Sequence, residues 1–161
     1  MRAFGASATR EARVYFTGGA TAVLMGWRDT TIDIDLRLNP ELDELFRALP
    51  KLKEELRINI ELVSPADFIP PLPGWEDRCL HIGREGKVSF YHYDPYSQAL
   101  AKIERGHTQD MKDVELMLKN GLLEREKLLS LYRAIEPQLY RYPAIDPGSF
   151  SQAVDRIVGQ K

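Results

Sequence analysis

The segment from Thr31 to Leu38, which is TIDIDLRL in one-letter code, determines most of what the sequence predicts about the fold. Its isoleucines and leucines alternate with Asp33, Asp35 and Arg37, and a period of two residues is typical of a β-strand with one buried face. The two aspartates therefore project from the same face, with their Cα atoms about 7 Å apart. Carboxylates gathered in this way repel one another unless a cation neutralises them, so this strand is also the first candidate for a functional site.

A second strand and a glycine turn precede this segment. Residues 14–17 (VYFT) are β-branched or aromatic and predict a short strand that ends at Gly18 and Gly19, before a short helix over residues 20–25. Glycines let a backbone approach a phosphate closely. The turn is therefore a candidate phosphate-binding element.

A third alternating segment follows at residues 57–63 (RINIELV), and it places Glu61 on its polar side. If this strand lies beside the strand that carries Asp33 and Asp35, the three carboxylates converge. Oxygen ligands of this kind suit Mg²⁺ or Mn²⁺ rather than zinc. Two such ions can stabilise both the attacking and the leaving oxygen of a phosphoryl transfer.

The remaining segments predict one more strand pair and a series of helices. Asn39 and Pro40 are typical of a helix start, and Pro50 is expected to divide the helix that follows. Residues 79–82 and 87–93 predict a hairpin. A helix capped by Asp94 is expected at residues 95–105 and stops at Gly106. Later helices are expected from a Thr108 cap to Gly121, at 123–135 and at 150–158. The expected fold is α+β (mixed α/β), with a small mixed sheet and flanking helices at 1–94 and a helical part at 95–161 that packs on it as one compact unit.

Composition restricts the class of protein. The chain has 161 residues, a net charge of −2 and a single cysteine, Cys79, so neither a polycation nor an internal disulfide is expected. No apolar run approaches the ~20 residues that span a bilayer, and the first residues do not form a signal peptide. These features predict a cytoplasmic protein without a membrane partner.

The motif of Gly18-Gly19, thirteen residues, and then Asp33-Ile34-Asp35-Leu36 resembles the signature of the polymerase-beta-like nucleotidyltransferase superfamily. In that superfamily a third Asp or Glu stands on a later strand, and Glu61 matches it. The local sequence around these motifs resembles a bacterial branch of small nucleotidyltransferases related to abortive-infection-type toxins. The resemblance covers about residues 14–118.

The resemblance implies a role for each matching residue. Asp33, Asp35 and Glu61 would be catalytic and hold Mg²⁺ or Mn²⁺, with two ions expected. Gly18 and Gly19 would hold the triphosphate of an NTP, with Thr17 or Thr21 nearby. Many members have Asp at the third position, so Glu61 makes a changed metal position or weak activity an alternative.

A later helical motif also matches. Lys102 and Arg105 lie three residues apart and share a helix face, as do Asp110 and Asp113. The resemblance implies that the two cations neutralise the triphosphate and that the two aspartates orient them or the nucleotide. The alternative is a set of surface salt bridges that contribute little.

The leading functional prediction is a metal-dependent enzyme that moves NMP from an NTP to a hydroxyl of a tRNA 3′ end or a protein, as a toxin with an antitoxin partner. A second is a degenerate module that binds nucleotide or a partner without catalysis. A third is an antibiotic-type adenylyltransferase that modifies a small molecule. The sequence does not identify the nucleotide, the acceptor or the oligomeric state.

Overall fold

A computed structural model describes residues 1–159, and these form two compact units. The first unit comprises residues 1–64 and 79–93. The second comprises residues 65–78 and the chain from Asp94 onward. The proline-rich segment 65–78 therefore groups with the helices, whereas the strand hairpin after it groups with the first unit. The packing of both parts into one body stays a prediction.

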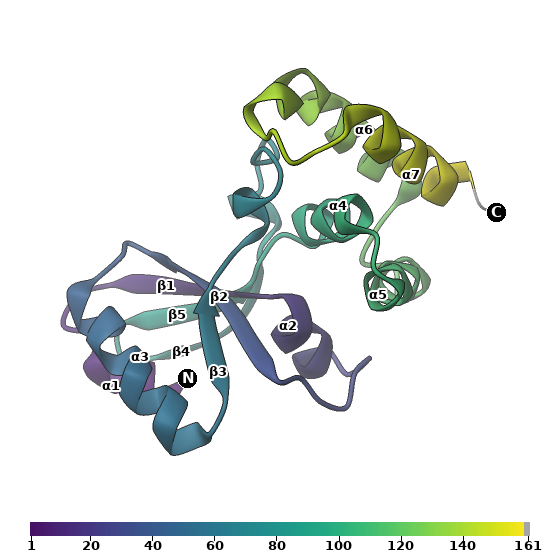
Figure 1. Cartoon of the computed structure of the whole chain (residues 1–161). Helices are drawn as coiled ribbons and strands as arrows, with labels where there is room; N and C mark the ends of the chain where they lie inside the picture. The colour runs from purple at the N-terminus through teal and green to yellow at the C-terminus, as the bar shows by residue number, and fades with distance from the viewer. Residues whose placement is uncertain (160–161) are drawn as a thin grey trace. The chain divides into compact units, whose positions relative to one another are not determined.

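A five-stranded mixed sheet forms the first unit (Figure 1). Its strands are β1 (Ala12–Thr17), β2 (Asp33–Asn39), β3 (Asn59–Leu62), β4 (Leu80–Glu85) and β5 (Val88–His92). The strand order is β3-β2-β1-β5-β4. The β2–β1 and β5–β4 pairs are antiparallel, and the β3–β2 and β1–β5 pairs are parallel. The α+β fold predicted from the sequence is confirmed.

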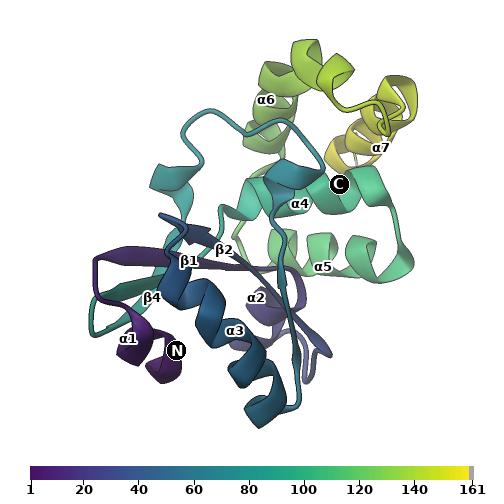
Figure 2. The same cartoon turned by 60° about the vertical axis from the view of Figure 1, so that its left-hand side comes forward.

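Three helices belong to the same unit: α1 (Arg2–Ser7), α2 (Gly18–Leu24) and α3 (Asp43–Leu56). One face of the sheet packs with α1 and α3 to form the hydrophobic core, as Figures 1 and 2 both show. The core residues are Phe4 from α1, Leu45, Leu49 and Leu52 from α3, and Val14, Phe16, Leu36, Ile60, Val88 and Phe90 from the strands. The sequence did not predict α1, which is six residues long and buries a single phenylalanine.

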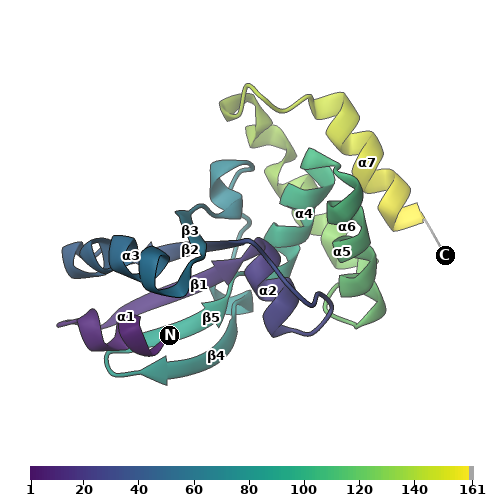
Figure 3. The same cartoon turned by 60° about the horizontal axis from the view of Figure 1, so that its bottom comes forward.

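The opposite face of the sheet is polar. Strand alternation directs Asp33, Asp35 and Arg37 of β2 away from the core that Leu36 enters, and Asn59 and Glu61 of β3 point the same way. Figure 3 shows β3, β2, β1, β5 and β4 in this order across the sheet. The predicted carboxylates therefore lie on the face opposite α1 and α3.

Two proline predictions for this unit are wrong. Asn39 ends β2 and the helix begins only at Asp43, so the Asn39–Pro40 pair connects strand to helix and does not start the helix. Pro50 does not divide the helix either, because α3 continues through it to Leu56. Burial of Leu45, Leu49 and Leu52 on one stripe outweighs the single hydrogen bond that an exposed proline removes.

The second unit is built from α4 (Pro95–Arg105), α5 (Thr108–Lys119), α6 (Arg125–Ile135) and α7 (Pro147–Gly159). The predicted start of α4 is confirmed, because the Asp94 carboxylate accepts a hydrogen bond of 3.1 Å from the Tyr96 amide. The guanidinium of Arg78 donates to both oxygens of the same carboxylate at 2.8 and 3.1 Å, which attaches the proline-rich segment to α4. For α5 the N-cap is His107, one residue before the predicted Thr108.

Among the described residues, no helix is both long and apolar enough to cross a membrane.

Candidate active site

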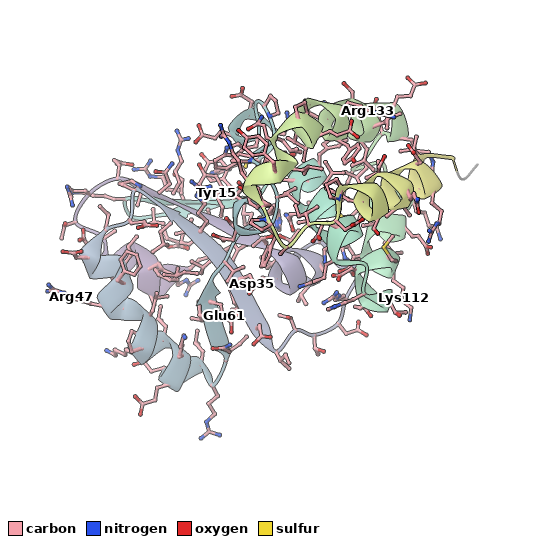
Figure 4. All side chains as sticks on the ribbon, turned by 45° about the horizontal axis from the view of Figure 1, so that its top comes forward. Tyr15, Asp35, Arg47, Glu61, Lys112 and Arg133 are labelled. Carbon is pink, nitrogen blue, oxygen red and sulfur yellow. The ribbon has the colours of Figure 1, made fainter. Side chains whose placement is uncertain are left out.

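Three carboxylates lie on neighbouring strands of the polar face. β3 pairs with β2 in parallel, and the register places Glu61 directly opposite Asp35 (Figure 4). The same register places Asn59 opposite Asp33. The sequence-based condition for convergence, that these two strands be neighbours, is therefore met. Side chains directly opposite each other on one face have Cβ atoms about 5 Å apart, so Asp35 and Glu61 share one small area.

The structure adds a residue that the sequence analysis did not single out. The side-chain amide of Asn59 donates to Asp33 Oδ1 at 3.1 Å and to Glu61 Oε1 at 2.6 Å. One NH₂ group thus bridges two carboxylates on different strands, and its partial positive charge reduces their repulsion. Alternation along β3 already places Asn59 on the same side as Glu61, but its contact with Asp33 depends on the strand pairing.

The Gly18-Gly19 turn fits closely against the carboxylate strand. Gly18 has φ +61°, and a Cβ at this position would lie 2.7 Å from Asp35 Oδ2. A Cβ on Gly19 would lie 2.3 Å from Thr31 Oγ1 and 3.4 Å from Arg28 Nη1. Real Cβ atoms do not approach oxygen this closely, so a side chain at either position would displace the Asp35 carboxylate or the Thr31 hydroxyl, and the positive φ of Gly18 also favours glycine. The turn therefore brings backbone, a carboxylate and a guanidinium together.

The two threonines near this turn, Thr17 and Thr21, are buried. The Thr21 hydroxyl donates to the Phe16 carbonyl at 3.1 Å, and its oxygen then accepts from His92 Nδ1 at 3.2 Å. These bonds tie α2 to β1 and β5 and favour the tautomer with hydrogen on Nδ1. Burial lowers the pKa of His92, so its imidazole is neutral at pH 7. Thr17 precedes α2 and is buried as well.

The donor set matches hard cations in chemistry. Asp33, Asp35 and Glu61 supply only oxygen ligands, which Mg²⁺ and Mn²⁺ prefer, and the space that a side chain on Gly18 would fill lies beside Asp35. Within residues 1–159, however, no three carboxylate, histidine or cysteine side chains stand close enough together to hold an ion. The backbone positions suit a metal site, but the Asp33 and Glu61 side chains are hydrogen-bonded to Asn59, whereas Asp35 Oδ2 lies beside Gly18.

A second cluster of charges lies within the helical unit, between α4 and α5. Lys102 Nζ is 2.7 Å from Asp113 Oδ2 and 3.4 Å from Asp110 Oδ1. Arg105 forms a two-pronged pair with Asp110, at 2.7 and 2.6 Å. The helix pairing predicted from the sequence is thus observed.

Burial distinguishes this cluster from ordinary surface pairs. Lys102 and Asp113 are 7% and 0% exposed, so the alternative of surface salt bridges is wrong for them, whereas the Arg105 side chain is 53% exposed. Burial by itself would raise the pKa of Asp110, but hydrogen bonds and charge from Arg105 and Lys102 hold that pKa below its ordinary value. The contact with a triphosphate that the resemblance implies for the two cations stays a prediction, and it would require these pairs to open.

The fold and the first cluster together define a class of protein. A mixed sheet that carries an Asp-x-Asp strand, a tightly fitted Gly-Gly turn beside it and a third carboxylate on the adjacent strand is the arrangement of a nucleotidyltransferase. Residues 6–144 match the model of the family described as "Nucleotidyltransferase of unknown function (DUF6036)", and the chain belongs to this family. No curated protein and no solved structure matches it.

Proposed function

We propose that the chain transfers a nucleoside monophosphate from an NTP to an acceptor hydroxyl and releases pyrophosphate. One observation carries the proposal: Asp33, Asp35 and Glu61 share a face of two paired strands, with Asp35 against the Gly18 turn. A triphosphate at that turn would have its α-phosphorus beside the carboxylates, which is the geometry that metal-assisted phosphoryl transfer needs.

The three carboxylates would hold Mg²⁺ or Mn²⁺, which supplies charge stabilisation for the attacking and leaving oxygens. The acceptor oxygen forms a bond to the α-phosphorus while the bond to the β-bridging oxygen breaks. The hydroxyl proton passes to the Glu61 carboxylate, which is exposed and can lose it to water. Arg28, whose guanidinium lies next to Gly19, would neutralise part of the triphosphate charge.

The Asn59 bridge favours a second candidate, a catalytically degenerate module that binds nucleotide or a partner protein. Its amide already satisfies two of the three carboxylates, and in the described residues no metal-ready group of three exists. Under this proposal the site would bind an NTP through the glycine turn without transferring it.

The finer assignments are also proposals. The resemblance supports a toxin of a toxin–antitoxin pair that acts in the cytoplasm on a tRNA 3′ end or a protein. An antibiotic-type adenylyltransferase is the remaining alternative, and it would need a small-molecule acceptor.

Incorporation of each labelled NTP into total tRNA and cell protein, with Mg²⁺ or Mn²⁺, tests the proposal. The Asp33→Ala/Asp35→Ala variant is the test, and Asp155→Ala, an exposed position on α7, is the matched control. Label that is lost only in the double variant establishes the enzyme and identifies its nucleotide and acceptor class. NTP binding without transfer to any acceptor supports the degenerate module.

A further inference from the structure

A second concave site lies in the sheet unit, away from the carboxylates. It is a polar pocket of about 410 Å³ lined mainly by Arg13, Asn39, Arg84, Ser89 and Tyr91. This volume falls in the range of small-ligand sites. Nothing in the proposed transfer chemistry uses these residues.

The pocket is positively charged. Arg13 and Arg84 supply two guanidinium groups, and Glu11 is the only carboxylate in its lining. Glu11 is paired with Arg84, at 2.6 Å between Oε1 and Nη2, and Arg84 Nε donates to the Gly86 carbonyl at 2.9 Å. Because a guanidinium carries five N–H donors, these bonds do not exhaust Arg84. A planar, forked cation of this kind suits a phosphate oxygen pair.

One aromatic ring, that of Tyr91, lines the same pocket, and neighbouring side chains hold it in place. The Tyr91 ring is stacked on Tyr15, with centroids 5.5 Å apart and planes at 28°. His81 contacts the Tyr91 ring edge-on at 5.2 Å, and Arg13 lies 6.0 Å above its centroid. A fixed tyrosine next to an arginine is the combination on which nucleobases stack in single-strand binding proteins.

The pocket and the carboxylates share one face of the β1–β2 pair. Arg13 lies opposite Asn39, whereas Thr17 lies opposite Asp35, so the two sites are four residues apart along these strands. At about 3.4 Å per residue this is a separation of roughly 14 Å. A ligand that occupies both sites must be an extended chain, because a small acceptor cannot reach from one to the other.

We propose that this pocket binds a phosphate and the adjoining base of a single-stranded nucleic acid whose terminal hydroxyl is the acceptor. The inference rests on the proposed function and deepens it, since it selects nucleic acid over protein and small molecules as the acceptor. Arg13 and Arg84 bind the phosphate and Tyr91 stacks on the base.

Fluorescence anisotropy with a short, end-labelled single-stranded RNA, measured over a range of salt concentrations, tests this inference. Arg13→Ala/Arg84→Ala is expected to weaken binding by at least about tenfold, because each charge-assisted contact contributes that much. Because the two arginines bind one phosphate together, the slope of log affinity against log salt should fall by about 0.7. Tyr91→Leu keeps the bulk of the side chain, and it should lower affinity by about tenfold without a change in that slope.

Arg47→Ala is the control, because Arg47 projects from α3, which covers the other face of the sheet (Figure 4). Unchanged affinity and slope in the double variant, or equal losses in the control, would overturn the inference, as would an absence of RNA binding. The two proposals fail separately. Label transfer to protein without RNA binding refutes only the nucleic-acid inference. RNA binding through the two arginines without label transfer refutes the transferase activity, and with it the acceptor role of the RNA, but leaves the RNA-binding pocket established.

Discussion

The Asn59 bridge makes a quantitative prediction about metal binding. In Asn59→Ala, the two hydrogen bonds from the amide to Asp33 and Glu61 are lost, and the carboxylates are left facing each other. Hydrogen bonds to charged groups contribute about 1.5–3 kcal/mol when buried, but Asn59 and Glu61 are exposed, so about 1 kcal/mol in total is a realistic loss. In a chain of this length, that corresponds to a fall in Tm of roughly 2–4 °C without metal.

The same substitution is expected to favour the cation. In the wild type an ion must displace the amide from both carboxylates, whereas in the variant it meets only water. A difference of about 1 kcal/mol corresponds to roughly fivefold tighter Mn²⁺ binding. The deficit in Tm should therefore disappear at saturating Mn²⁺, because the ion replaces the stabilisation that the amide supplied.

Thermal unfolding in EDTA and in a Mn²⁺ series, together with a Mn²⁺ titration followed by electron paramagnetic resonance, measures both quantities. Asn120→Ala, an exposed asparagine that ends α5, is the matched control and should change neither. Weaker Mn²⁺ binding in Asn59→Ala would refute the reasoning, because it would mean that Asn59 orients or ligates the ion. Identical Mn²⁺ responses in wild type and variant would refute it as well.

Three further predictions concern stability. Asp110→Asn should lower the free energy of unfolding by about 2 kcal/mol at pH 7. The folded-state pKa of Asp110 is depressed below 3.8, so its contribution to the free energy of unfolding is present above about pH 4 and is lost as pH falls through the folded-state pKa. In urea unfolding, the difference between wild type and variant should therefore be smaller at pH 3 than at pH 7. An equal difference at both pH values would contradict the assignment. Gly18→Ala should lower the Tm of the protein more than Gly26→Ala does. Both glycines have a positive φ, but only a Cβ at position 18 would meet Asp35 Oδ2. Equal Tm values for the two variants would contradict this reasoning. Pro50→Ala should raise Tm, since proline costs about 3 kcal/mol inside a helix and part of that cost is recovered; a lower Tm would show that Pro50 is needed in α3.

Local patterns in the sequence predicted much of the fold. The alternation at residues 31–38 and 57–63 predicted two strands, which the structure has at Asp33–Asn39 and Asn59–Leu62. It also predicted the face on which each acidic side chain stands, because side chains alternate with a period of two whatever their neighbours are. The cap at Asp94 and the stop at Gly106 predicted α4 for a similar reason, since both act within one turn of helix.

Where local signals competed with packing, the sequence analysis failed. Pro50 is a helix breaker by local rules, but α3 continues because its leucine stripe is buried on both sides of the proline. The Asn39–Pro40 pair has the residue types of a helix start, but β1 continues to pair with β2 as far as Asn39, so the pair ends a strand.

The candidate active site and the charge cluster also combine features that the sequence determines with features that only the tertiary structure determines. The sequence by itself determined which residue types are present and which share a face: two aspartates on one strand, an asparagine and a glutamate on another, and a glycine pair between strand and helix. Only the tertiary structure decided that β3 pairs with β2 so that Glu61 faces Asp35, that Asn59 bridges two carboxylates, and that Lys102 is buried between two aspartates. Apart from the bond between Asn59 and Glu61, these contacts join residues 8 to 26 positions apart. They depend on the burial of apolar side chains on the other face of the sheet and on α4 and α5, and not on the short-range pattern around each residue.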